Sequence, residues 1–164
     1  MMEAFTFYLF SFLIIVAALA VVTMRNIFHC ALFLILCLFS VAGIYVLLHA
    51  EFLAAVQVLI YVGAVSILII FAIMLTSRLA GRDVPMTNEQ TFLGGFMSLV
   101  LLFTLVYALK ETIFRVTAQA PAPQTTLRIG QMLLTDYVLP FELVSVLLLA
   151  TLIGAIIISR QEGN

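Results

Sequence analysis

Long apolar blocks separated by short polar stretches are the main pattern along this chain. Five blocks approach or reach the roughly 20 residues that a helix needs to cross the hydrocarbon of a bilayer: about 4–23, 27–48, 52–76, 92–109 and 138–158. None shows the period of two that marks a barrel strand. Because backbone polar groups in lipid are satisfied only in helices or closed barrels, the pattern predicts an all-α polytopic membrane protein with five transmembrane helices.

The connections between these blocks differ in length. Met24–Asn26 and His49–Ala50 are so short that the first three helices are expected to be antiparallel neighbours. Residues 77–91 are expected to form a polar loop. Within the longer connection 112–137, the stretch 127–137 predicts a short interfacial helix that leads into the last span.

Composition narrows the class of protein further. Of 164 residues, 65% are hydrophobic and 9% are charged, and the mean hydropathy is +1.30. A soluble domain of this size cannot bury that much apolar surface, so the lipid bilayer is the expected solvent. No polar segment is long enough to fold alone, which predicts one membrane domain over residues 1–164. The net charge of −1 gives no reason to expect a nucleic acid partner.

Basic residues predict the orientation in the membrane. One side would carry Arg25, Arg78, Arg82 and Arg160, and the other Lys110, Arg115 and Arg128. Most of the first set lies in short loops or tails close to helix ends. The positive-inside rule therefore favours a periplasmic N-terminus and a cytoplasmic C-terminus.

The sequence offers no redox or catalytic constellation. Cys30 and Cys37 lie seven residues apart in one block, roughly 10 Å along a helix axis, which is too far for a disulfide. The chain has no CxxC motif, paired histidines or Cys/His cluster, and no nucleophile with a base beside it. We therefore expect no metal site, no cofactor-binding residue and no catalytic residue in this chain.

The third apolar block carries unusual polar residues. Glu51 falls in the first turn of its helix, either as a cap favoured by the positive helix end or as a proton-relay carboxylate. Gln57 and Tyr61 are four residues apart and so adjacent on a helix surface. Because an amide and a phenol need partners in hydrocarbon, they predict either an interhelical hydrogen bond or part of a water chain.

Two further positions are candidates for irregular or polar structure. Gly63, inside Tyr61–Val65, permits either close helix packing or a π-bulge, a feature often found at functional sites. Glu142 follows Pro140 at the start of the fifth block and is expected in the first helical turn, by default as a cap. It is a secondary candidate for proton transfer.

The third block, FLAAVQVLIYVGAV from Phe52 to Val65, closely resembles subunit J of bacterial complex I. That complex is the proton-pumping NADH:quinone oxidoreductase, and the mitochondrial relative of the subunit is chain 6. The stretch IGQMLLTDYVLPFE from Ile129 to Glu142 is similar to the entry to that family's fifth span. The resemblance covers nearly the whole chain, and its most specific part is the pattern QxxxYxGA.

The resemblance implies a function in coupling. In that family the third helix carries a π-bulge, here at Tyr61–Val65, whose straightening and re-forming opens and closes a water path between the quinone site and the antiporter-like subunits. The subunit packs against the A and K subunits, lies near H and N, and is embedded in the bacterial inner membrane. It holds no cofactor, so NAD, FMN, iron–sulfur clusters and quinone are expected elsewhere in the complex. Some relatives carry glutamate where Gln57 stands, and an amide cannot hold that charge, which shifts any carboxylate role to Glu51.

The sequence therefore predicts a membrane-arm subunit that gates a proton path, with Glu51, Gln57, Tyr61, Gly63 and Val65 as candidates. Three alternatives stay open. The chain could serve a ferredoxin- or hydrogenase-linked complex, act as a purely structural subunit, or work as a small independent transporter. A transporter of this size would have to oligomerise, and no internal inverted repeat is evident.

Overall fold

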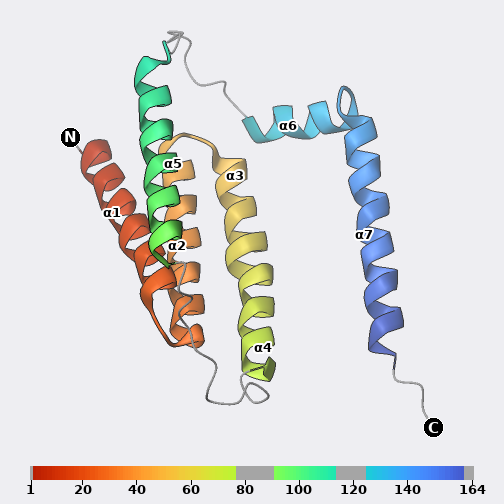
Figure 1. Cartoon of the computed structure of the whole chain (residues 1–164). Helices are drawn as coiled ribbons and strands as arrows, with labels where there is room; N and C mark the ends of the chain where they lie inside the picture. The colour runs from red at the N-terminus through yellow and green to blue at the C-terminus, as the bar shows by residue number, and fades with distance from the viewer. Residues whose placement is uncertain (1, 77–90, 114–124, 161–164) are drawn as a thin grey trace. The chain divides into compact units, whose positions relative to one another are not determined.

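The computed structural model describes residues 2–76, 91–113 and 125–160, and every regular element in these ranges is helical. In chain order the elements are α1 (Met2–Thr23), α2 (Ile27–Leu47), α3 (Glu51–Val56), η1 (Gln57–Val65), α4 (Ser66–Thr76), α5 (Thr91–Glu111), α6 (Thr125–Leu134) and α7 (Val138–Ser159). Figure 1 shows α3, η1 and α4 as one continuous rod. The all-α prediction is confirmed.

Five helices are long and apolar enough to cross a membrane: Met2–Thr23, Ile27–Leu47, Glu51–Thr76, Phe92–Glu111 and Val138–Ser159. The five predicted spans are therefore confirmed, with ends that differ by at most two residues from the apolar blocks. The predicted loop at 77–91 lies almost wholly outside the described residues.

Local signals fix both ends of α2. The Asn26 side chain accepts a hydrogen bond from the Phe28 amide at 3.0 Å and caps the start of the helix. At the other end His49 has a φ of 55°, and the amides of His49 and Ala50 donate to the carbonyls of Val46 and Tyr45. This Schellman motif reverses the chain within two residues and delivers it directly into α3.

The first three spans are antiparallel neighbours, as predicted. α2 contacts α1 on one side and α3, η1 and α4 on another (Figure 1). Among the described residues the buried apolar side chains are all small: Ala17, Ala31, Ala42 and Ala54. Small residues let helix backbones approach closely in a membrane, where packing rather than water exclusion drives association.

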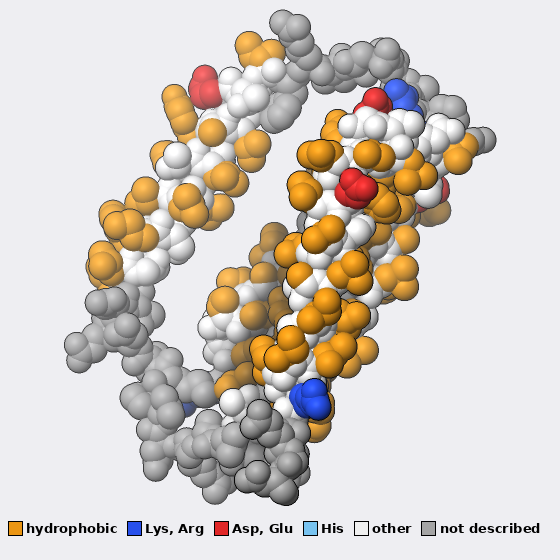
Figure 2. Space-filling model, turned by 90° about the vertical axis from the view of Figure 1, so that its right-hand side faces the viewer, with side chains coloured by type: hydrophobic (Ala, Val, Ile, Leu, Met, Phe, Trp, Pro, Cys, Tyr) orange, Lys and Arg blue, Asp and Glu red, His pale blue; other side chains and the backbone are white. Residues whose placement is uncertain are grey.

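Large hydrophobic side chains point outward. Large hydrophobic side chains are exposed along all five spans, and Figure 2 shows hydrophobic side chains covering the visible face of the helices with few charged groups between them. Such a surface is incompatible with water and matches the hydrocarbon of a bilayer. The few polar side chains that this apolar surface surrounds are therefore the candidates for a functional site.

The chain divides into two compact units, Met1–Pro121 and Ala122–Asn164. In the first unit every described side chain of α5 is exposed. In the second unit α6 contacts α7, which confirms the predicted short helix before the last span, although it ends at Leu134 rather than residue 137. The single membrane domain over residues 1–164 stays a prediction.

Candidate functional site

The third span changes helix type in its middle. α3 gives way at Gln57 to η1, nine residues of π-helix that end at Val65, and α4 then continues as regular α-helix. The predicted π-bulge is confirmed, and the irregular segment begins four residues before Tyr61. The π-helix is rare and concentrates at functional sites, which makes η1 the candidate site of this chain.

Gln57, the first residue of η1, is tied to the neighbouring helix. Its side chain is only 7% exposed, and its Nε2 donates to the Leu38 carbonyl of α2 at 3.3 Å. This is the interhelical hydrogen bond that was one of the two interpretations of Gln57 from sequence. The bond satisfies a polar group that would otherwise be costly in lipid, and it fixes the start of η1 against α2.

Ser66 closes the other end of the π segment. Its side chain is 2% exposed, and its hydroxyl donates to the Tyr61 carbonyl at 2.7 Å, five residues back. The Ser66 amide is divided between the carbonyls of Tyr61 and Gly63. It passes over Val62, whose carbonyl would be its acceptor in a regular α-helix.

The π segment has a consequence for which residues face α2. Gln57 and Ser66 are nine positions apart, which in an α-helix is about two and a half turns and would put them on opposite faces. Both are nevertheless buried, and both η1 and α4 contact α2. The wider turns of η1 therefore bring Ser66 round to the face that Gln57 occupies.

Gly63 does not serve close helix packing within the described chain. A Cβ built at this position would meet one atom within 4 Å, the Val58 carbonyl oxygen at 3.4 Å, and that oxygen belongs to η1 itself. Its φ is not positive. At Gly43 in α2, by contrast, a Cβ would lie 2.5 Å from the Phe10 ring of α1. Of the two interpretations of Gly63, the structure bears out irregular helix geometry.

The remaining predicted residues lie at different levels of the third span. Glu51 is the first residue of α3 and is exposed, and Ala50 before it makes no side-chain cap. Tyr61 lies in the middle of η1 with its side chain 48% exposed. Val65 is the last residue of η1 and is half-buried. Gln57 and Ser66 are thus the polar side chains turned toward α2, whereas Glu51 and Tyr61 are open.

Glu142 lies deeper in its helix than predicted. α7 begins at Val138, so Pro140 is its third residue and Glu142 its fifth, beyond the first turn. Proline is tolerated there because the first amides of a helix have no partner inside it. The expectation of a first-turn cap at Glu142 was wrong.

Sequence reasoning missed Ser66. A serine in an apolar block is read at α-helical spacing, which pairs its hydroxyl with a carbonyl four residues back, as Ser40 does with Leu36. The bond to Tyr61 five residues back exists only because the segment is π-bonded. The sequence feature that could have identified Ser66 is its position: it is a hydroxyl residue directly after the glycine-containing stretch 61–65.

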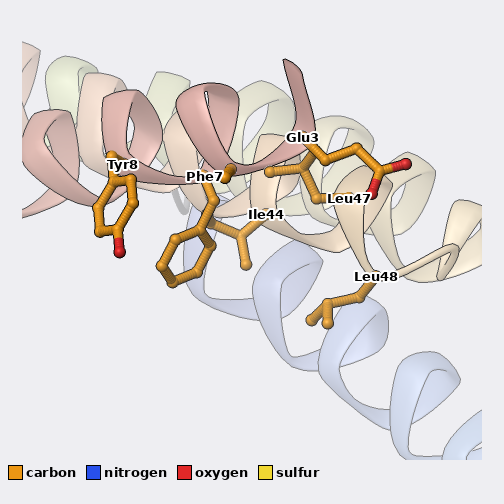
Figure 3. A pocket seen from close by; sticks show the side chains of 7 residues that line it. Glu3, Phe7, Tyr8, Ile44, Leu47 and Leu48 are labelled. Carbon is orange, nitrogen blue, oxygen red and sulfur yellow. The ribbon is translucent and has the colours of Figure 1, made fainter. Parts of the chain in front are cut away.

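Two open grooves border α2, and no predicted site residue lines either of them. One groove, of about 350 Å³, runs between the start of α1 and the end of α2 (Figure 3). Glu3, Phe7 and Tyr8 of α1 line it together with Ile44, Leu47 and Leu48, and the Phe7 ring lies beside Ile44. The other, of about 310 Å³, is apolar and lies where α1, α2 and the beginning of the third span meet. The described ranges hold no cluster of three or more His, Cys, Asp or Glu side chains that could bind a metal ion.

The family model described as NADH-ubiquinone/plastoquinone oxidoreductase chain 6 matches residues 17–158. The F(420)H(2) dehydrogenase subunit J of Methanosarcina mazei is 36% identical over 99% of this chain and 94% of its own length. The NAD(P)H-quinone oxidoreductase chain 6 of Synechocystis is 42% identical over 96% of this chain and 80% of its own. The matched region includes the whole of the third span and therefore η1.

Proposed function

Because the chain belongs to the NADH-ubiquinone/plastoquinone oxidoreductase chain 6 family, we propose that it gates the water path that couples quinone reduction to proton translocation. It is a membrane subunit of a quinone oxidoreductase complex. In our proposal that complex is a bacterial inner-membrane NADH-quinone oxidoreductase, and the N-terminus of this chain lies in the periplasm. Its neighbours are the A, K, H and N subunits. NAD, FMN, iron–sulfur clusters and quinone belong to other subunits, and this chain does no redox chemistry.

The observation that carries the gating proposal is η1 itself. If the segment changes to α bonding, each residue of shift turns the following helix by about 100°. With Gln57 held on the Leu38 carbonyl, the rotation falls on α4. A one-residue shift puts Val65 at the buried position of Ser66 and turns the apolar side chains of α4 past α2. The third span therefore has two hydrogen-bonding registers, π and α, and in each of them α4 presents different side chains to the neighbouring helices.

The backbone of η1 also offers a place for water. In lipid every carbonyl needs a donor, and the Val62 carbonyl lacks the amide that it would have in an α-helix. Tyr61, beside it in sequence, is about half exposed. A water molecule bound at this carbonyl fits the general rule that unpaired backbone groups inside a protein are satisfied by ordered water. Conversion to α bonding would return the Ser66 amide to Val62 and remove that binding position.

The candidate residues then have separate roles. Glu51 is the one carboxylate among the candidates in the third span, and its exposed place at the helix start suits proton exchange with water or with a neighbouring subunit. Gln57 positions the helix. Tyr61 and Val65 change surroundings with the register, and Gly63 keeps side-chain bulk away from the Val58 carbonyl. Glu142 is a secondary carrier on α7.

Replacing Gly63 with valine tests this function. In the π register its Cβ would lie 3.4 Å from the Val58 carbonyl, and its methyl groups would crowd η1 further. We expect an overpacking cost of about 1–3 kcal/mol, directed against that register. NADH-driven proton pumping should fall severalfold, with smaller losses of complex assembly and of quinone reduction. Pumping is measured by a pH-sensitive dye in vesicles, and assembly by native gel.

Gly94→Val in α5 is the matched control, because nothing lies within 4 Å of a Cβ built at Gly94. It should leave the ratio of protons pumped to NADH oxidised unchanged. Equal losses of pumping and assembly in Gly63→Val would make Gly63 a packing residue and would refute the gating role.

A second candidate function has a specific observation in its favour. The Methanosarcina relative, which covers 99% of this chain, is named as a subunit of an F(420)H(2) dehydrogenase. The same membrane subunit could therefore serve a complex with a different electron donor. Purifying the intact complex and assaying quinone reduction with NADH, with reduced coenzyme F420 and with reduced ferredoxin separates these candidates. Activity with NADH alone supports the first proposal.

A further inference from the structure

Ser66 lies outside the set of residues that sequence reasoning assigned to the site, yet its contacts mark the boundary between the two helix types. We propose that the Ser66 hydroxyl is the positioning group that holds the third span in its π register. It donates to the Tyr61 carbonyl at 2.7 Å from a side chain that is 2% exposed. The inference deepens the proposed gating function and rests on it for its physiological meaning.

The reason lies in how the Tyr61 carbonyl is satisfied. In the π register the Ser66 amide is shared between Tyr61 and Gly63, so Tyr61 receives only part of an amide bond. The hydroxyl supplies a second, undivided bond to the same oxygen. In an α register the Val65 amide would serve Tyr61 fully, and a serine hydroxyl would add a redundant bond four residues back. The hydroxyl therefore contributes more to the π register than to the α register.

Burial reinforces this preference. Ser66 is buried only because η1 turns it to the face that Gln57 occupies, and Gln57 is itself bonded to α2. In the α register Ser66 would rotate away from this position by about 100° for each residue of shift. The two polar contacts thus bracket η1. Gln57, the first residue of η1, bonds to α2 at one end. At the other end the Ser66 hydroxyl bonds to the Tyr61 carbonyl, which also accepts from the Ser66 amide in the last π turn.

Helix α2 contains a matched control. Ser40 is 1% exposed and its hydroxyl donates to the Leu36 carbonyl at 2.8 Å, four residues back in a regular α-helix. Ser40 and Ser66 have the same side chain, nearly the same burial and the same kind of acceptor. They differ in helix type, so a comparison of Ser66→Ala with Ser40→Ala isolates the effect of the hydroxyl on the π register.

The experiment is hydrogen–deuterium exchange of the assembled complex in lipid nanodiscs, read by mass spectrometry on peptides that cover Gln57–Ser66. Losing a net hydrogen bond should raise the opening constant, and hence the exchange rate, about fivefold in Ser66→Ala. Ser66→Thr retains a hydroxyl and should restore most of the protection. Ser40→Ala should leave exchange in this segment unchanged. In structures of the same complexes, any second register that Ser66→Ala populates should be α-helical.

Unchanged protection in Ser66→Ala, or equal acceleration of this segment in Ser40→Ala, would overturn the positioning role. If Ser66→Ala does not accumulate as a complex, Ser66→Cys keeps the size of the side chain with a weaker donor. A smaller acceleration in that variant supports the role, and none refutes it. Faster exchange with fully coupled pumping would instead refute the gating function and leave the positioning role standing.

Discussion

α2 is held by its two neighbours in different ways. Against α1 the contact is steric: Gly43 leaves a space that the Phe10 ring fills, and a Cβ there would lie 2.5 Å from the ring. Against the third span the polar contact is directional: the Gln57 amide reaches the Leu38 carbonyl. No atom of α2 lies within 4 Å of a Cβ built at Gly63. The contact with α1 is thus mainly a fit of shape, to which the Cys37 thiol adds a long, weak hydrogen bond to the Ile14 carbonyl at 3.9 Å. The contact with the third span includes the stronger bond from an amide.

The difference between these two contacts of α2 determines which helix can change its position. At the contact of Gly43 with Phe10, a shift of either helix produces overlap or a void. The third span is tied to α2 by the hydrogen bond of Gln57, and no atom of α2 crowds Gly63, so the helix beyond Gln57 can rotate while that bond holds. The rotation would replace the buried Ser66 with another side chain of the third span. The pair α1 and α2 is therefore the fixed part of this bundle, and α4 beyond η1 is the part suited to a change of register.

The largest effect that follows from this comparison is expected at Gly43. Gly43→Ala places a methyl group against the tip of the Phe10 ring, and overpacking of this kind costs about 1–3 kcal/mol, less where the ring turns into the adjoining apolar groove. We expect a marked loss of assembled complex on native gels and a lower thermal midpoint. Reducing the ring in Gly43→Ala/Phe10→Leu should recover part of the loss.

The same substitution at Gly63 sharpens the contrast. Gly63→Ala adds a Cβ at ordinary contact distance, 3.4 Å from the Val58 carbonyl, and alanine favours helix over glycine by about 1 kcal/mol. Assembly of this variant should equal the wild type or exceed it. Equal damage at Gly43 and Gly63 would show that both sides of α2 are close-packed in the complex.

A middle-sized effect is expected at Gln57. Gln57→Met keeps the length of the side chain and removes the donor to the Leu38 carbonyl. Interhelical hydrogen bonds in membranes contribute about 0.6 kcal/mol on average and at most about 1.7 kcal/mol. The thermal midpoint of the complex should therefore fall less than in Gly43→Ala, whereas the coupling of pumping to quinone reduction should weaken clearly.

Gln131→Met on α6 controls for the change of side chain, because Gln131 is exposed. It should leave both readouts unchanged. A Gln57→Met variant with a normal ratio of protons to electrons would mean that the third span does not need its tie to α2.

Sequence predicted the spans well and the site only in part. Each apolar block is long enough to define a helix by itself, so the five spans follow from local pattern. From residues alone, Gly63 left close packing and a π-bulge open, and the family resemblance favoured the bulge. Helix type there depends on where Gln57 and Ser66 meet α2, and contacts between separate helices are not visible in one helix's pattern.

Ser66 and Glu142 show the same limit of prediction from sequence at single residues. Ser66 was missed because its bond to the Tyr61 carbonyl belongs to π spacing. Glu142 was placed in the first turn of the last span because Pro140 resembles a helix start. The Phe141 amide already bonds back to the Tyr137 carbonyl, so α7 begins earlier, at Val138.

The smallest effect on stability, and the sharpest on coupling alone, is expected from Tyr61→Phe. Among the described residues the Tyr61 hydroxyl has no hydrogen-bond partner, and the ring is 48% exposed, so its loss should leave assembly unchanged. If the hydroxyl joins a water chain beside the Val62 carbonyl, losing one hydrogen bond should slow proton transfer along that chain about fivefold and so lower the ratio of protons to electrons. Tyr107→Phe on α5, where the ring is 60% exposed, is the control and should keep the normal ratio. If Tyr61→Phe keeps the normal ratio of protons to electrons, the phenol has no part in gating. The backbone of η1 would then act alone, through the rotation of α4.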